Sequence, residues 1–511
     1  MLLIILTFSF YLRWINLEKL PYGIENDELS STIATFLKLN NILPSDKGIW
    51  SLFNGTNIVF DKFNQLSFYI FGPDIMSPRK MLALTSSLAL IPYHLFSRQF
   101  FSRLVSLLLL FLFSFSPYKL IMSRIPHGPV YGDLFLYPSL MLILFFSAKD
   151  VKKTVLALFF SGLLINLSIF NYNLAYTMPV MAIVTIFLRG IFLKIKFKKI
   201  ILYMFIFLLP FIFSFALIKN GLEIEKSKGY AMVNSVYQIN NNIFRPTKLL
   251  VNLKTIYGQF FEGLRYDTGD MFVLYSGTLI NRVIVLLSIF GLFISIINFK
   301  KYYLFIIWFI LGPLIYNLFL GIFWPRTWFL SFGLVYLLAG VTLESLYKTI
   351  HKFSPFYKLI LILILFFPFI YYYCQYTQKN YFESFNNPAF LISQREIYSI
   401  AKRYKDQIGK KILFIVPELG ERPVNAVYAT VSFYYLVQNP NKAQYFKKTD
   451  RQTLGVIDKW EFENHSETYF KNYRIFVVDN SLLQISDSIL IKFNTYKPVM
   501  IKNKYFTEIF Y

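Results

Sequence analysis

The stretch SRLVSLLLLFLFSFSPYKLI, residues 102–121, is long and apolar enough to cross a lipid bilayer as a helix, which takes about 20 residues. Similar apolar runs recur along the chain up to residue 374. They cover residues 1–14, which is a short run, 80–97, 130–148, 153–171, 175–193, 200–218, 281–298, 302–322, 327–346 and 357–374. Together these runs predict a polytopic α-helical membrane protein with about eleven transmembrane helices.

The composition of the 511 residues indicates the same class of protein. The chain is 56% hydrophobic, 20% aromatic and only 16% charged, a balance that requires contact with lipid. Its formal net charge is +24, but Lys and Arg lie mostly between the apolar runs, so the charge indicates topology and not a nucleic-acid-binding surface. Cys374 is the only cysteine, so the chain forms no intramolecular disulfide.

The loop charges orient the predicted helices. Five connections between alternate apolar runs carry Lys or Arg: residues 98–103, 149–153, 189–199, 300–301 and 348–358. By the positive-inside rule these connections are cytoplasmic. Parity then places the long loops 15–79 and 219–280, and everything after Cys374, on the outer side of a multi-pass protein of the cell (plasma) membrane. Loops of this length usually have a function.

The composition changes to that of a soluble domain from about Gln375 onward. KKILFIVPE (410–418) and YRIFVVDN (473–480) are typical of buried strands, and EIYSIAKRYKDQIG (396–409) is typical of an amphipathic helix. We therefore predict two domains, a transmembrane domain over residues 1–374 and a small extracytoplasmic α/β domain over residues 375–511.

Asp27 and Glu28, within LPYGIENDELSS, are the strongest local feature of the first outward loop. Adjacent carboxylates beside the membrane face concentrate negative charge near a low dielectric, where one of them can act as a general base. The dipeptide alone favours a simpler interpretation, a solvated loop or the N-terminus of a helix, where acidic residues are favoured by the helix dipole.

Arginines at the predicted outward ends of spans form a second set of candidates: Arg79, Arg124, Arg265 and Arg326. A guanidinium group suits bidentate phosphate recognition, and a phosphate at the membrane face would belong to a lipid. The alternative for each residue taken singly is an interfacial anchor. Together they depart from the inward bias of positive charge, which favours a function.

Three further residues are candidates for binding a substrate or a cation. His127 follows Arg124, and Asp267 and Asp270 lie in the second long loop within RYDTGDMF. A structural histidine and an Asx turn explain these residues about equally well. No pair of ligands has helical metal spacing, so a metal site stays unassigned.

The order of these features resembles a known family, the bacterial polytopic glycosyltransferases of the C-type fold in the protein mannosyltransferase and aminoarabinose transferase group. The resemblance rests on RWINLEKLPYGIENDELSS from Arg13, on Phe71, Gly72 and Arg79, on Ser116, Pro117, Ser123 and Arg124, on Gly269 and Asp270, and on Arg326. It covers residues 1–350. The chain departs from the family pattern after the Ser-Arg pair and before Arg326, which leaves the acceptor class and metal dependence open.

The resemblance implies an inverting transferase that moves a hexosyl or pentosyl group from a polyprenyl-phosphate donor to a hydroxyl group at the outer membrane face. Asp27 would be the base, Glu28 would orient it or bind the acceptor, and Arg124, Arg326 and Arg79 would hold the donor phosphate. The partners would be the lipid-linked sugar, membrane lipid and an acceptor protein, lipid or glycan, with no nucleic acid. No cofactor is required, and a divalent cation is compatible with this chemistry.

Other functions share this topology. A polymerase or ligase of lipid-linked glycans would differ only in its product. A transporter or flippase would place ionisable residues near the bilayer midplane and show repeated halves, whereas the predicted spans are nearly free of mid-membrane charge and no halves correspond. A scaffold or receptor would not require so many helices.

Overall fold

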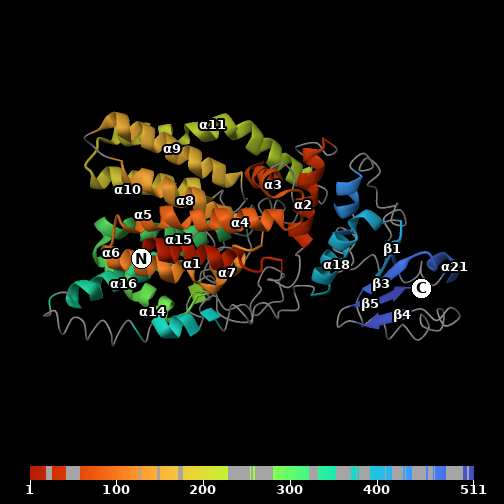
Figure 1. Ribbon diagram of the computed structural model, residues 1–511. Helices are drawn as coiled ribbons and strands as arrows, with labels where there is room; N and C mark the ends of the chain where they lie inside the picture. Colours follow the sequence, from red (N-terminus) through yellow and green to blue (C-terminus); the bar gives the residue numbers. More distant parts are fainter. Residues whose placement is uncertain are drawn as a thin grey trace. The chain divides into compact units, whose positions relative to one another are not determined.

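The computed structural model describes residues 1–18, 26–41, 58–125, 128–146, 150–170, 177–227, 280–320 and 332–350. Beyond residue 350 it describes shorter segments, of which the main ones are 370–375, 392–408, 410–416, 433–439, 456–458, 467–478, 499–502 and 506–510. These parts form two compact units (Figure 1). Unit 1 consists of residues 1–15, 53–63 and 80–384, and unit 2 of residues 16–52, 64–79 and 385–511.

Unit 1 is helical, and its helices run side by side (Figure 1). They are α1 (Leu2–Trp14), α5 (Leu90–Ser97), α6 (Arg103–Ser114), α7 (Pro117–Met122), α8 (Gly128–Leu144), α9 (Val151–Ile169), α10 (Met178–Phe192), α11 (Phe197–Ser227), α14 (Arg282–Ile297), α15 (Phe299–Leu320) and α16 (Phe332–Ile350). The ends of α3 (Ile58–Phe71) and α4 (Ser77–Leu88) belong to different units.

Glycines allow two pairs of these helices to pack closely. A Cβ atom on Gly162 of α9 would overlap the carbonyl of Phe207 on α11, and one on Gly291 of α14 would overlap the carbonyl of Leu338 on α16. Small residues at such contacts are typical of helix packing in membranes, where the backbones approach each other closely.

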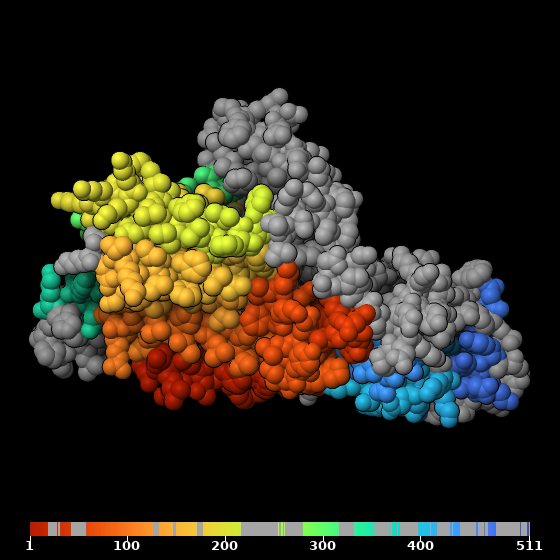
Figure 2. Space-filling view, turned by 90° about the horizontal axis from the view of Figure 1, so that it is seen from above, coloured from red at the N-terminus to blue at the C-terminus, as the bar shows by residue number. Residues whose placement is uncertain are grey.

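Apolar side chains also cover much of the outer surface of unit 1. Figure 2 shows α11 in yellow on one face, where Phe205, Phe213 and Phe215 are 52%, 81% and 63% exposed. Exposed apolar side chains at this density match a surface in contact with lipid. Among the described residues, Val151–Ile169 and Phe197–Phe215 are long and apolar enough to span a bilayer, and further apolar helices are shorter. The predicted number of about eleven spans and their orientation stay predictions.

Unit 2 contains a mixed five-stranded sheet in the order β2-β1-β3-β5-β4. The strands are β1 (Ile412–Val416), β2 (Val456–Asp458), β3 (Arg474–Val478), β4 (Val499–Lys502) and β5 (Phe506–Phe510), accompanied by the helices α2 (Asn26–Leu39), α18 (Ile392–Arg403) and α21 (Glu467–Phe470). β1 is parallel to β2 and β3, and β5 is antiparallel to β3 and β4.

The two faces of this sheet explain why its central strands are continuous apolar runs. Side chains alternate between faces along a strand, and both faces are covered. Ile412 and Phe414 of β1 pack in a cluster that also contains α18 and α2 residues, whereas Leu413 and Ile415 pack on the other face with Phe470 of α21.

Unit 2 contains segments from both sides of the domain boundary that the sequence suggests at residues 374 and 375. The sheet lies within residues 375–511, but residues 15–79, which the sequence predicts as an outward loop, contribute α2 and the turn between α3 and α4 to the same unit. The predicted boundary at residues 374 and 375, and the extracytoplasmic location of the C-terminal part, stay predictions.

Candidate functional site

The helix α2 begins at Asn26, so Asp27 and Glu28 lie in its first turn. The backbone carbonyl of Glu28 accepts hydrogen bonds from the hydroxyl groups of Ser31 and Thr32, at 2.8 and 2.7 Å. Acidic residues are favoured in this position because the N-terminal end of a helix carries partial positive charge. This placement agrees with the helix-terminus alternative, although the side chain of Glu28 is fully buried and not solvated.

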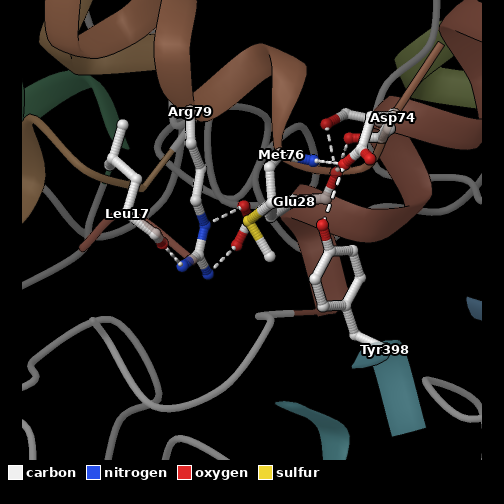
Figure 3. A network of polar contacts seen from close by, with 8 residues as sticks. Leu17, Glu28, Asp74, Met76, Arg79 and Tyr398 are labelled. Carbon is white, nitrogen blue, oxygen red and sulfur yellow. Dashed lines mark hydrogen bonds and ion pairs between the residues drawn. The ribbon is translucent and has the colours of Figure 1, made fainter. Parts of the chain in front are cut away.

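Glu28 forms a bidentate ion pair with Arg79, across 51 residues of sequence (Figure 3). Arg79 Nε lies 2.5 Å from Glu28 Oε1, and Arg79 Nη2 lies 2.8 Å from Oε2. Arg79 Nη1 also donates to the carbonyl of Leu17 at 3.3 Å. Both side chains are fully buried, so removing either partner would leave an uncompensated charge, at a cost of about 3–5 kcal/mol.

Arg79 lies in the first turn of α4, and a tight turn from Gly72 to Ser77 leads into that helix. Gly72 has a φ of +79°, a conformation that side chains rarely adopt, and its carbonyl accepts a hydrogen bond from the hydroxyl of Ser77 at 2.6 Å. Asp74 Oδ1 accepts from the backbone N–H of Met76 at 2.8 Å. The Phe-Gly phrase that precedes Arg79 therefore sets the backbone conformation from which α4 starts.

Arg124 lies in unit 1, where it contacts the end of α1. Its Nη1 and Nη2 atoms donate to the carbonyls of Leu12 and Ile15, each at 2.6 Å. Arg13 makes a similar contact in the other direction, because its Nη2 donates to the carbonyl of Ser114, the last residue of α6, at 2.9 Å. Both arginines are fully buried, and both satisfy carbonyls at helix C-termini.

Lys119 and Asp133 form a buried ion pair in unit 1 that the sequence analysis does not predict. Lys119 also lies over the ring of Phe113, 5.4 Å from its centroid. The signal was present, since each residue is a charge inside a predicted span, at 102–121 and 130–148. Ionisable residues in such segments usually have a function and a partner of opposite charge.

The remaining site residues predicted from the sequence have no described side chains. His127, Arg265, Asp267, Asp270 and Arg326 lie outside the described residues, and of Asp27 only the backbone position is described. Within the described part of the chain, no group of three or more His, Cys, Asp or Glu residues is arranged to hold a metal ion.

Comparisons with known proteins give the fold. The chain matches no protein-family model, and no curated protein matches it in sequence. The structure of an Archaeoglobus fulgidus oligosaccharyltransferase in complex with Zn and sulfate has a TM-score of 0.52 at 13% identity, over 94% of this chain and 68% of that one. Apo ArnT from Cupriavidus metallidurans has a TM-score of 0.50 at 12% identity, over 99% of this chain and 97% of that one.

The same ArnT bound to undecaprenyl phosphate has a TM-score of 0.47 at 11% identity, again over 99% and 97% of the two chains. The fold assignment rests on the two higher scores, and it confirms the fold that the resemblance in the order of motifs implies. The protein accordingly has the C-type fold of polytopic membrane glycosyltransferases.

Proposed function

We propose that this protein transfers a sugar from a polyprenyl-phosphate donor to an acceptor hydroxyl group at the outer face of the membrane. The observation that supports this function most strongly is the buried ion pair between Glu28, in the first turn of α2 and next to Asp27 in sequence, and Arg79 of α4, in a chain with this fold. A fully buried ion pair is costly to desolvate, so its presence beside an acidic residue favours a function for this turn.

The proposed reaction is a single inverting displacement. The acceptor oxygen attacks the anomeric carbon of the sugar, the bond from that carbon to the phosphate oxygen breaks, and the phosphate leaves with the electron pair. Phosphate is already a good leaving group, so the enzyme needs a base for the acceptor hydroxyl proton and cations for the departing charge. Asp27 accepts the proton.

Glu28 orients this turn through Arg79 and does not itself take the proton. Both of its carboxylate oxygens accept hydrogen bonds from Arg79, which fixes the position of the Glu28 side chain. Arg79 is in turn committed to Glu28, so its part in phosphate binding is indirect.

Arg124 and Arg326 hold the donor phosphate in this proposal. The contacts of Arg124 with the carbonyls of α1 fix the direction of its guanidinium group, which reduces the entropy lost when a phosphate binds. ArnT, whose apo structure shares the fold, has also been crystallised bound to undecaprenyl phosphate. We propose a lipid phosphate of this kind as the donor carrier here.

A divalent cation is compatible with the proposed chemistry. The archaeal oligosaccharyltransferase with the same fold was crystallised with Zn, and the residues of this chain that we would assign to a cation are Asp267, Asp270 and His127. Full transfer activity after exhaustive treatment with EDTA would remove the cation from the proposal.

Purified protein in detergent or proteoliposomes, supplied with undecaprenyl phosphate carrying a labelled hexose or pentose and a cell-envelope extract, tests the function directly. We expect label to move to an acceptor in a single addition per site. Label that polymerises into a long glycan would indicate a polymerase or ligase. Labelled donor that only changes leaflet, with its sugar bond intact, would indicate a flippase and contradict transfer.

A further inference from the structure

The helix α18, in the C-terminal part of the chain, makes polar contacts with the turn that begins α4. Tyr398 donates its hydroxyl proton to Asp74 Oδ1 at 3.1 Å, and Lys402 Nζ lies 2.9 Å from Asp74 Oδ2. Lys402 Nζ also donates to the hydroxyl oxygen of Tyr398 at 2.8 Å, so the two side chains act on Asp74 together. Figure 3 shows Tyr398 pointing toward Asp74.

Asp74 connects these contacts to the Glu28–Arg79 pair. The oxygen that accepts from Tyr398 also accepts from the backbone N–H of Met76, just before the first residue of α4. Arg79 lies five residues after Asp74, in the first turn of that helix. A shift of Asp74 would therefore move the backbone that aims Arg79 at Glu28 (Figure 3).

Apolar contacts join the same parts of unit 2. One buried cluster contains Ile33 and Phe36 of α2, Met76 beside Asp74, and Ile397 of α18. The ring of Phe36 lies 5.5 Å from that of Phe433, edge to face. The helix with Asp27 and Glu28 is thus packed against residues from the C-terminal part of the chain.

We propose that Tyr398 and Lys402 are positioning residues, which hold the turn at Asp74 so that Arg79 fixes Glu28 and the first turn of α2 in the geometry that transfer requires. This inference rests on the proposed function. It assigns the C-terminal part of the chain a role in positioning the site, and none of its residues needs to touch the reacting atoms.

Lys402 and Tyr398 both have pKa values above their usual ones. Burial lowers the pKa of Lys402, but hydrogen bonds with Tyr398 and Asp74 outweigh burial, and the pKa of this amine lies above its usual value. Burial raises the pKa of the Tyr398 hydroxyl, and the charge of Asp74 raises it further. Glu18, 3.5 Å from Lys402 Nζ, adds to the negative surroundings of the amine. Transfer should therefore not depend on titration of Lys402 or Tyr398 around neutral pH.

Kinetics of four full-length variants test the proposal. Lys402→Met, Tyr398→Phe and Asp74→Asn should each lower kcat by about tenfold while leaving the KM for the labelled donor within about twofold, because misplaced groups slow the reaction more than they weaken binding. Arg403→Met is the matched control, since Arg403 is the exposed neighbour of Lys402 on the same helix, and it should keep wild-type kcat.

Two further measurements separate positioning from general damage. The double variant Lys402→Met with Asp74→Asn should also lose about tenfold and not a hundredfold, because both changes break one contact. Lys402→Arg, which keeps the charge, should recover most of kcat. Additive losses, or a Lys402→Met protein as active as Arg403→Met, would overturn the inference.

Hydrogen exchange of α2 gives a readout that does not depend on sugar chemistry. Lys402→Met should raise amide exchange over residues 26–39 relative to Arg403→Met, with the melting temperature changed little. Unchanged exchange in α2 would contradict the coupling even if kcat fell. If the wild-type protein transfers no sugar, the proposed function has failed, and this exchange still decides whether α18 holds α2 in place.

Discussion

Arg79 in unit 2 and the pair Arg13 and Arg124 in unit 1 are equally buried but have different partners. Arg79 faces a carboxylate, that of Glu28, and the two charges cancel. Arg13 and Arg124 donate to main-chain carbonyls at the C-termini of α6 and α1, where the helix dipole supplies only partial negative charge. In the sequence, Arg79 and Arg124 belong to one class, outward arginines suited to phosphate.

The burial of an arginine therefore does not by itself indicate its role. An arginine that satisfies helix carbonyls keeps its net charge and can still attract an anion. An arginine paired with a carboxylate has lost most of its long-range attraction and instead fixes the position of that carboxylate. The following variants test this distinction.

The largest effect is expected for Arg79→Met. It leaves the Glu28 carboxylate buried and unpaired, so we expect a loss of about 3–5 kcal/mol in the free energy of unfolding, measured by denaturation in detergent. The double variant Arg79→Met with Glu28→Met should recover most of this stability, since no unpaired charge remains, but not the transfer activity. A double variant as unstable as the single one would show that Arg79 acts through contacts other than the ion pair.

Lys119→Leu tests whether the other buried ion pair behaves in the same way. The side chains of Lys119 and Asp133 are 9% and 11% exposed, so we expect the low end of the same range, about 3 kcal/mol. Lys119→Leu with Asp133→Leu should recover stability. Transfer by that stable double variant would assign the pair to packing of α7 and α8, whereas loss of transfer with normal stability would assign it to the reaction.

Arg13→Gln and Arg124→Gln separate capping from phosphate binding. Each change removes charged hydrogen bonds to helix carbonyls, so both variants should lose about 1.5–3 kcal/mol of stability. Only Arg124→Gln should also raise the KM for the lipid-linked donor, by about tenfold, which corresponds to roughly 1.4 kcal/mol. An equal KM in the two variants would restrict Arg124 to the capping role.

The smallest effect is expected at a helix N-terminus. The side chain of Asp150 accepts a hydrogen bond from the backbone N–H of Lys153 at the start of α9, which lowers the pKa of this exposed carboxyl. Because the pKa is lowered on folding, the stabilisation exists at neutral pH and is lost as the pH falls through the lowered value. Asp150→Ala should slightly lower the melting temperature at neutral pH, and the difference from the wild-type protein should shrink in acid, once the pH falls below the lowered pKa of this carboxyl.

The sequence predicts the fold well because its signals are local. Apolar runs, loop charges and the phrase from Arg13 to Ser31 each depend on neighbouring residues. The C-type fold that the family resemblance implies is confirmed, whereas the orientation that the loop charges predict stays a prediction. The position of Asp27 and Glu28 in a first helical turn also follows from a local preference for acidic residues.

The polar contacts could not be predicted because they join distant residues. Glu28 and Arg79 are 51 positions apart, and Tyr398 and Asp74 are 324 apart. The apolar run around Lys119 is long enough to predict a span, but it does not identify the partner that a single charge within a span needs. The grouping of α2 with the C-terminal sheet depends on packing among Phe36, Phe68 and Phe433, which no local pattern indicates.

Asp27→Asn tests most directly whether the first turn of α2 takes part in sugar transfer. Glu25→Gln is its control, because it also removes one carboxylate from the same stretch. We expect Asp27→Asn to lower the rate of transfer from labelled undecaprenyl-phosphate sugar by about 10²–10⁴-fold, the range that a general base contributes, with unchanged membrane insertion and melting temperature. Glu25→Gln should stay within about twofold of the wild-type rate, a change of less than 0.5 kcal/mol. An Asp27→Asn protein that transfers sugar at a near-normal rate would contradict the account.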